Sequence, residues 1–317
     1  MKLVQMTTAA LTAGAIALGA LTTVAADYPS ETVKAVVPFG AGGGTDRWAR
    51  VMSSVAFDVM DNGWHIQNRG GAAGTIGWKY MEDQGADGHT ILLASPTPVI
   101  AALLESKPPF DPKAVKVAAY YSIMKPTLVA AQGQDWSTWE GLVKYAAAGG
   151  KKLTVGGTNT QLLGAANLFE QAGIDAIYVP YSGTGKAVND FLGGHINMVM
   201  VTTSTALTLT DRGSVVVNTS DRAYGEKIAT ALGNPPRADE LGFKGFNPPR
   251  FIAMHGDTPA EQVKVMGEKI GAMLETKSVK KLIGKLGEEI VFVGYPEAQK
   301  QYEATVEQSA EVMKLLQ

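Results

Sequence analysis

The chain has 317 residues, with 28 Lys and Arg against 30 Asp and Glu, which gives a formal net charge of -2 at pH 7. This small acidic excess argues against a nucleic-acid partner or an anionic lipid surface, because both require concentrated positive charge. The chain contains no cysteine, which excludes disulfides, a lipoprotein anchor, a thiol nucleophile and thiolate metal sites. Its length exceeds the usual size of one domain and therefore indicates two.

The first residues are typical of an export signal. Lys2 precedes an uncharged stretch over residues 3–26, whose apolar centre is followed by the small residues Val24, Ala25 and Ala26. This pattern predicts a secretory signal peptide over residues 1–26, cleaved before Asp27. The alternative is an uncleaved membrane anchor, which the short apolar centre, broken by Thr and Gly, disfavours. We therefore expect an exported, soluble protein.

The rest of the chain alternates between short apolar strands and segments with helical spacing. The apolar periodicity predicts strands at 34–37, around 66, and at 90–94, 153–155, 177–179, 196–201, 215–217 and 251–254. It predicts helices at 48–59, 76–84, 139–148, 162–172, 186–192 and 259–275. Such alternation indicates an α/β fold with parallel sheets covered by helices on both faces, and ligand binding at the carboxyl ends of the strands.

A glycine-rich turn joins the first expected strand to the first helix. The segment from Val36 to Asp46 contains Gly40, Gly42, Gly43 and Gly44. Glycine permits positive φ and has no Cβ to block a ligand, while the first turn of a helix offers unpaired N–H groups and partial positive charge. The segment therefore predicts a site for a carboxylate or phosphate. A valine at position 43 is expected to penalise positive φ and to obstruct the ligand while leaving the fold intact.

An exported or nucleotide-dependent α/β enzyme acting on an anionic small molecule is the rival interpretation of the same turn. In either register of a dinucleotide fingerprint the third glycine is missing, because Thr45 or Arg47 stands there. A Walker loop at Gly185 and Lys186 fails as well, since Ala187 replaces the required Ser or Thr. No G-x-S-x-G segment occurs, and the four histidines lack the spacing of metal ligands. We therefore predict a binding protein without catalytic residues, cofactor or metal.

Four segments, in this order, resemble the periplasmic solute-binding proteins of tripartite tricarboxylate transporters, the Bug family: Val36 to Asp46, Asn68 to Gly77, Asp87 to Leu92, and Val179 to Gly194. The resemblance covers essentially the whole chain after residue 26. It implies a two-lobed, type II (Venus flytrap) periplasmic-binding fold with mixed, mostly parallel sheets. It also implies a monomer that captures a small organic carboxylate and delivers it to the membrane permease subunits of such a transporter.

The resemblance further implies where the lobes and the site lie. Two crossings near residues 122–127 and 217–220 would divide the chain into one lobe of residues 27–124 plus 219–317 and a second of residues 125–218. In the family, loops from both lobes contact the ligand carboxylate, largely through backbone N–H groups and bound water. By position these are, in one jaw, Phe39, Gly40, Ala41, Gly42, Gly43 and Asp46, with Ser95 and Thr97 beside it, and in the other Gly157, Thr158, Asn159, Tyr181, Ser182, Thr202, Thr203 and Ser204.

Several of these side chains have two open interpretations. Asp46 either orients ligand donors or simply favours the first turn of the helix through its charge. Phe39 and Tyr181 either wall the ligand or pack beneath their turns. Lys186 either pairs with a second ligand carboxylate or is solvated.

The chain departs from the family pattern at four positions. Gly70 and Lys186 replace a common Pro, His89 replaces a common Tyr, and Asn197 replaces an Asp. The last change removes an acidic group from that position. The motifs leave open which carboxylate is bound: di- and tricarboxylates, acidic amino acids and aromatic carboxylates all remain candidates.

Overall fold

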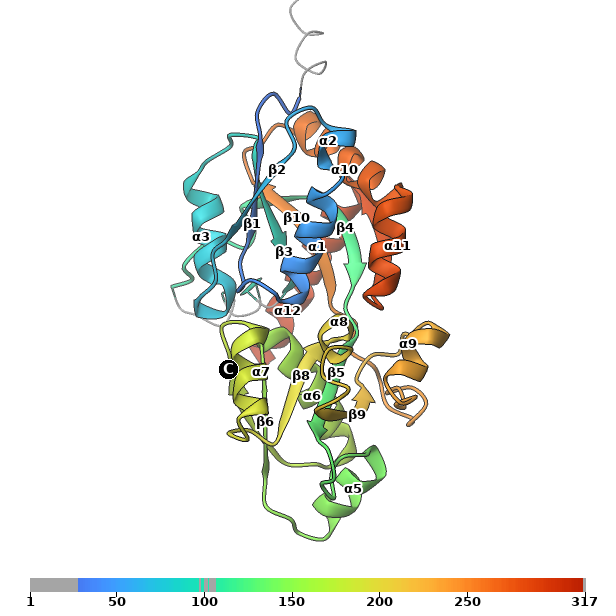
Figure 1. Cartoon of the computed structure of the whole chain (residues 1–317). Helices are drawn as coiled ribbons and strands as arrows, with labels where there is room; N and C mark the ends of the chain where they lie inside the picture. The colour runs from blue at the N-terminus through green and yellow to red at the C-terminus, as the bar shows by residue number, and fades with distance from the viewer. Residues whose placement is uncertain (1–27, 97, 100–101, 103–106, 316–317) are drawn as a thin grey trace, which may run out of the picture.

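The computed structural model of the chain describes residues 28–96, 98–99, 102 and 107–315 and shows two lobes, each built on one β-sheet (Figure 1). The expected signal peptide, residues 1–26, lies outside the described residues. Within the described ranges no helix combines the length and the apolar character that a membrane crossing requires.

The first lobe is built on a six-stranded sheet of order β11-β4-β10-β3-β1-β2. Its strands are β1 (Val33–Val37), β2 (Trp64–Asn68), β3 (Thr90–Ala94), β4 (Val115–Ile123), β10 (Pro249–His255) and β11 (Glu289–Gly294). Its helices are α1 (Gly44–Ser53), α2 (Ala56–Val59), η1 (Ala72–Gly74), α3 (Thr75–Asp83), α10 (Ala260–Glu275), α11 (Lys277–Lys285) and α12 (Glu297–Leu315).

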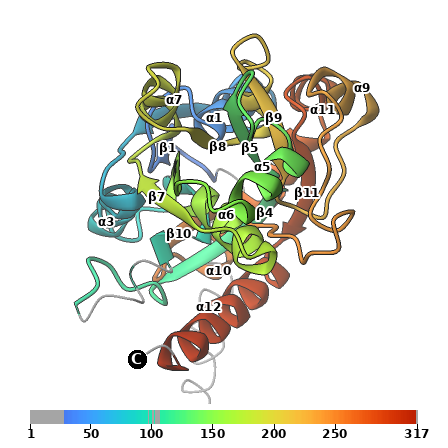
Figure 2. The same ribbon diagram turned by 90° about the horizontal axis from the view of Figure 1, so that it is seen from below.

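Helices cover both faces of this sheet, as the sequence predicts. Trp48 of α1 and Ile270 of α10 are buried in the core on one face. Trp78 of α3 and Tyr302 of α12 are buried in a separate core on the other face. Figure 2 shows α1 and α12 on opposite sides of the molecule. The carboxyl end of β1 is therefore fixed from both sides, together with the glycine-rich turn that follows it.

The second lobe is built on a five-stranded sheet of order β7-β6-β8-β5-β9. Its strands are β5 (Pro126–Ala131), β6 (Leu153–Gly157), β7 (Ala176–Pro180), β8 (Met198–Thr202) and β9 (Gly213–Asn218). Phe169 and Phe191 lie in the cores on its two faces. The associated helices are α5 (Trp139–Ala147), α6 (Asn159–Ala172), α7 (Thr184–Leu192), α8 (Thr203–Ala206) and α9 (Glu226–Ala231).

Both sheets are mixed, and the α/β expectation is confirmed. The expectation of mostly parallel sheets is wrong, because five of the pairings between the described strands are antiparallel and four are parallel. The strands that alternate with helices pair in parallel, as β2-β1-β3 and β7-β6-β8. The strands around the lobe connections pair antiparallel: β10 with β3 and β4, β11 with β4, and β5 with β8 and β9. β4 leads out of the first lobe and β10 leads back into it, so these two neighbouring strands run in opposite directions. Parallel pairing is thus limited to the helix-linked strands.

The two connections between the lobes lie side by side. Met124 and Lys125 join β4 to β5, and the Met124 N–H donates to the Pro248 carbonyl over 2.9 Å. The Thr219 N–H donates to the Pro126 carbonyl over 3.0 Å. Beyond β9, the chain stays with the second lobe before β10 begins, since Tyr224 and Ala238 are buried in that lobe's cores.

Candidate ligand-binding site

A small cavity lies between the lobes, where the carboxyl ends of β1, β3, β6 and β8 meet. The cavity has a volume of about 30 Å³, counted as the space that the centre of a water molecule can reach. Figure 1 shows α1 on one side of this boundary and α7 and α8 on the other. Half of the lining residues bear a hydroxyl group, and Arg250 is the charged one among the described residues. The lining consists of Phe39, Gly43, Gly44, Thr45, Ser95, Met124, Thr158, Thr160, Gln161, Thr184, Thr202 and Arg250.

The glycine-rich turn brings the first turn of α1 to this cavity. Gly42 has φ +79°, so it supplies the left-handed backbone that the turn needs. Gly43 has φ −73° in an extended conformation, so the expected positive φ at this position is wrong. Among the described side chains, none caps the start of α1. The helix terminus that borders the cavity through Gly44 and Thr45 therefore favours an anion.

Asp46 supports the glycine-rich turn through hydrogen bonds of its carboxylate. Its Oδ2 accepts the Gly42 N–H over 2.9 Å and the Arg50 Nε over 2.8 Å, and its Oδ1 accepts the Asn68 Nδ2 over 3.0 Å. Burial acts to raise the pKa of Asp46, but the hydrogen bonds from Arg50, Gly42 and Asn68 outweigh it and hold this pKa below its usual value. With these partners Asp46 holds the turn in shape, and it does not line the cavity.

The opposite wall is organised by Gln161 in the first turn of α6. Its Oε1 accepts the Thr158 N–H over 3.1 Å, and its Nε2 donates to the Thr184 Oγ1 over 3.4 Å. Gln161 thereby connects the starts of α6 and α7. Thr202, at the end of β8, is 3.0 Å from Ser204 between the two hydroxyl oxygens. The wall therefore presents hydroxyl groups and helix N-termini.

The lobes touch across the cavity. The Ser95 hydroxyl lies 3.3 Å from the Thr160 hydroxyl, and the Arg47 guanidinium of α1 donates to the Ser204 carbonyl of α8 over 2.5 Å. A Cβ on Gly183 would lie 3.3 Å from the Gly40 nitrogen. The two jaws are thus closed on each other.

The structure brings five of the residues expected from the resemblance into the cavity lining: Phe39, Gly43, Ser95, Thr158 and Thr202. Thr97 lies outside the described residues. The remaining expected residues belong to the same turns or the strand and helix ends beside them but do not line the cavity: Gly40, Ala41, Gly42, Asp46, Gly157, Asn159, Tyr181, Ser182, Thr203 and Ser204.

Tyr181 packs beneath its turn. Its ring approaches Gly156, where a Cβ would lie 2.8 Å from the Tyr181 Cε2. Its hydroxyl donates to the Asp190 Oδ2 over 2.6 Å. Burial and the neighbouring Asp190 raise the pKa of Tyr181 to about 12. These contacts make Tyr181 a support of the turn.

Gly44 and Thr45 also line the cavity and belong to the segment predicted to bind an anion, whereas sequence reasoning missed Met124, Thr160, Gln161, Thr184 and Arg250. Two of them carry a signal in the sequence. Arg250 is a charged residue at the start of the apolar run from Phe251 to Met254, and Gln161 stands three residues after Thr158, as in a capping box. The others are placed by neighbours that are remote in sequence.

The structure shows the surroundings of the four residues that depart from the family pattern. The Asn197 Oδ1 accepts both the N–H and the hydroxyl of Thr154, each over 2.9 Å. The His89 Nε2 accepts the Ser30 N–H over 3.0 Å. A Cβ on Gly70 would lie 3.1 Å from the Gly40 nitrogen, so a glycine here lets two loops approach closely. Lys186 is exposed on α7.

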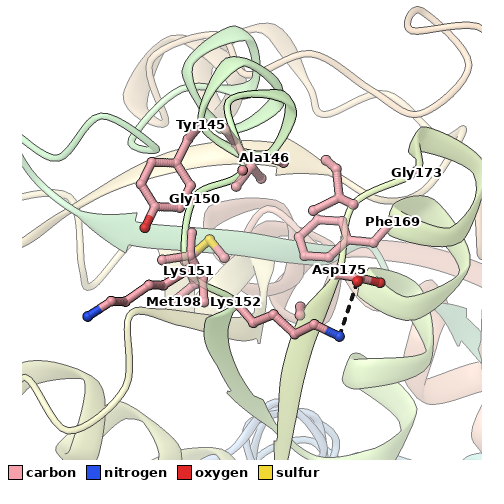
Figure 3. A pocket seen from close by; sticks show the side chains of 14 residues that line it. Tyr145, Ala146, Gly150, Lys151, Lys152, Phe169, Gly173, Asp175 and Met198 are labelled. Carbon is pink, nitrogen blue, oxygen red and sulfur yellow. Dashed lines mark ion pairs between the residues drawn. The ribbon is translucent and has the colours of Figure 1, made fainter.

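A second pocket lies at the other end of the second lobe and offers about 230 Å³ to the centres of water molecules (Figure 3). Leu153 and Ala176, at the starts of β6 and β7, contribute to it. At its rim, Lys152 pairs with Asp175 over 3.1 Å. The pocket thus lies at the amino ends of the strands, whereas open α/β sheets bind ligands at the carboxyl ends.

The described part of the chain holds no group of three or more side chains suited to a metal ion.

Two sheets joined by adjacent connections, with a polar cavity where the strand ends of both lobes meet, define the class of two-lobed periplasmic binding proteins. The chain belongs to the tripartite tricarboxylate transporter family receptors, whose family model matches residues 49–317. It is 27% identical over 268 residues to protein BugT of Bordetella pertussis, covering 81% of this chain and 80% of BugT.

Solved structures agree with this assignment. The periplasmic binding protein BugD superposes with a TM-score of 0.79 at 26% identity, covering 90% of this chain and 98% of BugD. MatC from Rhodopseudomonas palustris, a structure with bound malate, superposes with a TM-score of 0.76 at 21% identity, covering 90% of this chain and 100% of MatC. The resemblance inferred from the sequence motifs is thereby confirmed.

Proposed function

We propose that this protein is a periplasmic receptor that captures one small organic carboxylate between its lobes. The observation that carries the proposal is the cavity itself. It is bordered by the first turn of α1 without a side-chain cap among the described residues, by hydroxyl groups from both lobes and by a buried arginine. Helix N-termini and guanidinium groups both stabilise carboxylates. Malate bound to MatC, a protein of the same fold, supports this ligand class.

The proposed mechanism is closure on the ligand. A carboxylate that contacts both jaws favours the closed form by the contacts it makes only there. We propose that the hinge lies at the adjacent connections, at Met124 and Lys125 and at the chain between β9 and β10. At the first connection, the limit between the first and the second lobe then lies close to residues 124 and 125. Residues 219–247 move with the second lobe in this scheme, because Tyr224 and Ala238 pack there.

Delivery of the ligand to membrane permease subunits follows from the receptor family and forms part of the proposal. The exported protein is expected to act as a monomer in the periplasm, and size-exclusion chromatography with light scattering checks that state. In this scheme the protein transforms nothing and uses no cofactor. The competing function is that of a nucleotide-dependent enzyme. A receptor would be stabilised by a carboxylate, and such an enzyme by NAD or ATP.

A thermal-shift panel tests the proposal. It contains acetate, L-lactate, L-malate, adipate, citrate, L-aspartate, L-glutamate and benzoate beside NAD and ATP. A ligand at a hundredfold excess over its dissociation constant stabilises the fold by about 2.7 kcal/mol, which a melting curve resolves. We expect at least one acid to do so without turnover. Stabilisation by NAD or ATP with none by any acid would support the enzyme instead. Mass spectrometry of molecules that copurify with the protein identifies the natural ligand.

The variant Gly43→Val tests the location of the site. Gly43 has φ −73°, and a Cβ there would lie 3.4 Å from the Gly40 carbonyl oxygen and 3.9 Å from the Thr184 hydroxyl oxygen. The backbone therefore tolerates valine, while the branched side chain narrows the cavity. We expect the variant to fold and to lose binding. A folded variant that binds as the wild type does would remove the glycine-rich turn from the site.

A further inference from the structure

Arg250 is a fully buried cation whose hydrogen-bonding capacity is only partly used. Its Nη1 donates to the Glu288 Oε2 over 2.9 Å and to the Ser122 hydroxyl over 3.2 Å. Within the described residues its Nε and Nη2 have no hydrogen-bond partner. A buried donor that stays unpaired costs free energy, and it costs more when it belongs to a charged group. Two unpaired donors on the Arg250 side chain point to a hydrogen-bond acceptor on a bound ligand.

The unpaired nitrogens form a geometric unit. Nε and Nη2 together make one edge of the planar guanidinium, and such an edge matches the two oxygens of a carboxylate. Arg250 lines the cavity, and its Nη2 would lie 3.0 Å from a Cβ on Gly44. This edge therefore lies beside the first turn of α1, which also favours an anion.

Glu288 explains how the cation is tolerated. Its side chain is 2% exposed and pairs with Nη1, on the far side from the unpaired edge. The carboxylate offsets the buried charge and fixes the orientation of the guanidinium, as a buried pair requires. Because Glu288 engages only Nη1, it leaves the Nε and Nη2 donors to another acceptor.

We infer that Arg250 binds a carboxylate of the ligand directly, through its Nε and Nη2 edge, and that the backbone N–H groups of the first turn of α1 share that carboxylate. The inference rests on the proposed function and adds a specificity-determining residue to it. A fixed, charged fork discriminates an acid from the amide of the same shape, because an amide offers only one acceptor and no charge.

Binding of acids and their amides tests this role. Titration calorimetry compares L-malate with its diamide, and L-lactate with its amide, so that each amide probe lacks a carboxylate. The double variant Arg250→Gln/Glu288→Gln removes both buried charges and keeps similar side-chain volume. We expect it to weaken acid binding by about a hundredfold or more, since each hydrogen bond to a charged group contributes about tenfold or more. Amide binding should change by less than about threefold, so the preference for the acid disappears.

Two further variants separate ligand contact from structural support. Glu288→Gln alone keeps the donor edge of Arg250 and should retain or tighten acid binding. Arg237→Gln is the matched control, because Arg237 pairs with Asp239 away from the cavity. Circular dichroism and melting curves establish that each variant is folded.

The outcomes separate the two proposals. If the folded double variant keeps the acid preference, or if Glu288→Gln loses it equally, Arg250 is not the ligand anchor, while the proposed function stands. If the wild type binds no carboxylate of the thermal-shift panel, the proposed function fails and this inference with it.

Discussion

Arg47 and Ser204 join the two lobes by a direct hydrogen bond. The guanidinium of Arg47, in the first turn of α1, donates to the carbonyl oxygen of Ser204 in α8 over 2.5 Å. Arg47 does not line the cavity. The bond therefore belongs to the closed arrangement and stabilises it without contacting a ligand.

Arg47→Ala is expected to weaken ligand binding through closure alone. Loss of one hydrogen bond of about 1 kcal/mol corresponds to about fivefold weaker binding. Calorimetry measures the affinity, and small-angle scattering measures the contraction on binding, which should be smaller. The control is Arg212→Ala, at an exposed position. Unchanged affinity and contraction in Arg47→Ala would mean that this bond does not favour closure.

Gly44→Ala is expected to keep the lobes apart. A Cβ at this position would lie 2.8 Å from the Thr202 Cγ2 and 3.0 Å from the Arg250 Nη2. Thr202 is β-branched and yields little, so the contact must open the jaws. Binding should weaken by about tenfold or more, the equivalent of about 1.4 kcal/mol. Gly185→Ala is the matched control, since a Cβ there meets nothing within 4 Å. Equal binding by both variants would contradict the closed geometry.

Thr158→Val is expected to have a milder effect. Thr158 lines the cavity at the start of α6, where its hydroxyl oxygen accepts from the backbone of Gln161 in a capping box, so its O–H can donate to a ligand carboxylate. Loss of one such hydrogen bond costs roughly 1–2 kcal/mol, which is roughly fivefold to thirtyfold in affinity. Calorimetry with the best acid of the panel measures it, beside Thr230→Val on the exposed side of α9. An affinity equal to that of the control would exclude a contact between this hydroxyl and the ligand.

Asp46→Asn is expected to lower the free energy of unfolding at pH 7 by about 1–3 kcal/mol, because it removes a buried acceptor of several hydrogen bonds. The pKa of Asp46 is lowered in the folded protein, so its stabilising contribution is present above the unfolded pKa of about 3.9 and is lost as the pH falls toward the folded pKa. Urea unfolding at pH 7, 5 and 3.5 should show the difference between wild type and variant shrinking below about pH 4. A constant difference would show that the charge of Asp46 does not stabilise the turn.

Removal of the signal peptide is expected to leave Asp27 as the first residue of the exported protein. Small residues at positions 24–26 favour cleavage there. Intact-mass measurement of periplasmic material decides the point. A chain that keeps residues 1–26 in the membrane fraction would contradict a soluble receptor.

The fold class, the receptor family and the turns of both jaws could be predicted from the order of the amino acids. These features are local. The run from Gly40 to Gly44 between a strand and a helix, and the segment from Val179 to Gly194, are legible because glycine content and apolar periodicity act over a few residues. The resemblance to the receptor family placed Phe39, Gly43, Ser95, Thr158 and Thr202 on loops of the two jaws, and these five residues line the cavity.

The neighbours that those loops acquire depend on the packing of segments that are distant in the chain. Arg250 reaches the cavity because β10 pairs antiparallel with β3 and β4, and its partner Glu288 lies just before β11. Gln161 joins Thr184 because α6 and α7 begin at the same edge of the second sheet. The positive φ falls on Gly42 and not on Gly43, and Asp46 turns inward to hold that backbone. Strand pairing and packing between distant segments set these contacts, and neither is encoded in the spacing of nearby residues.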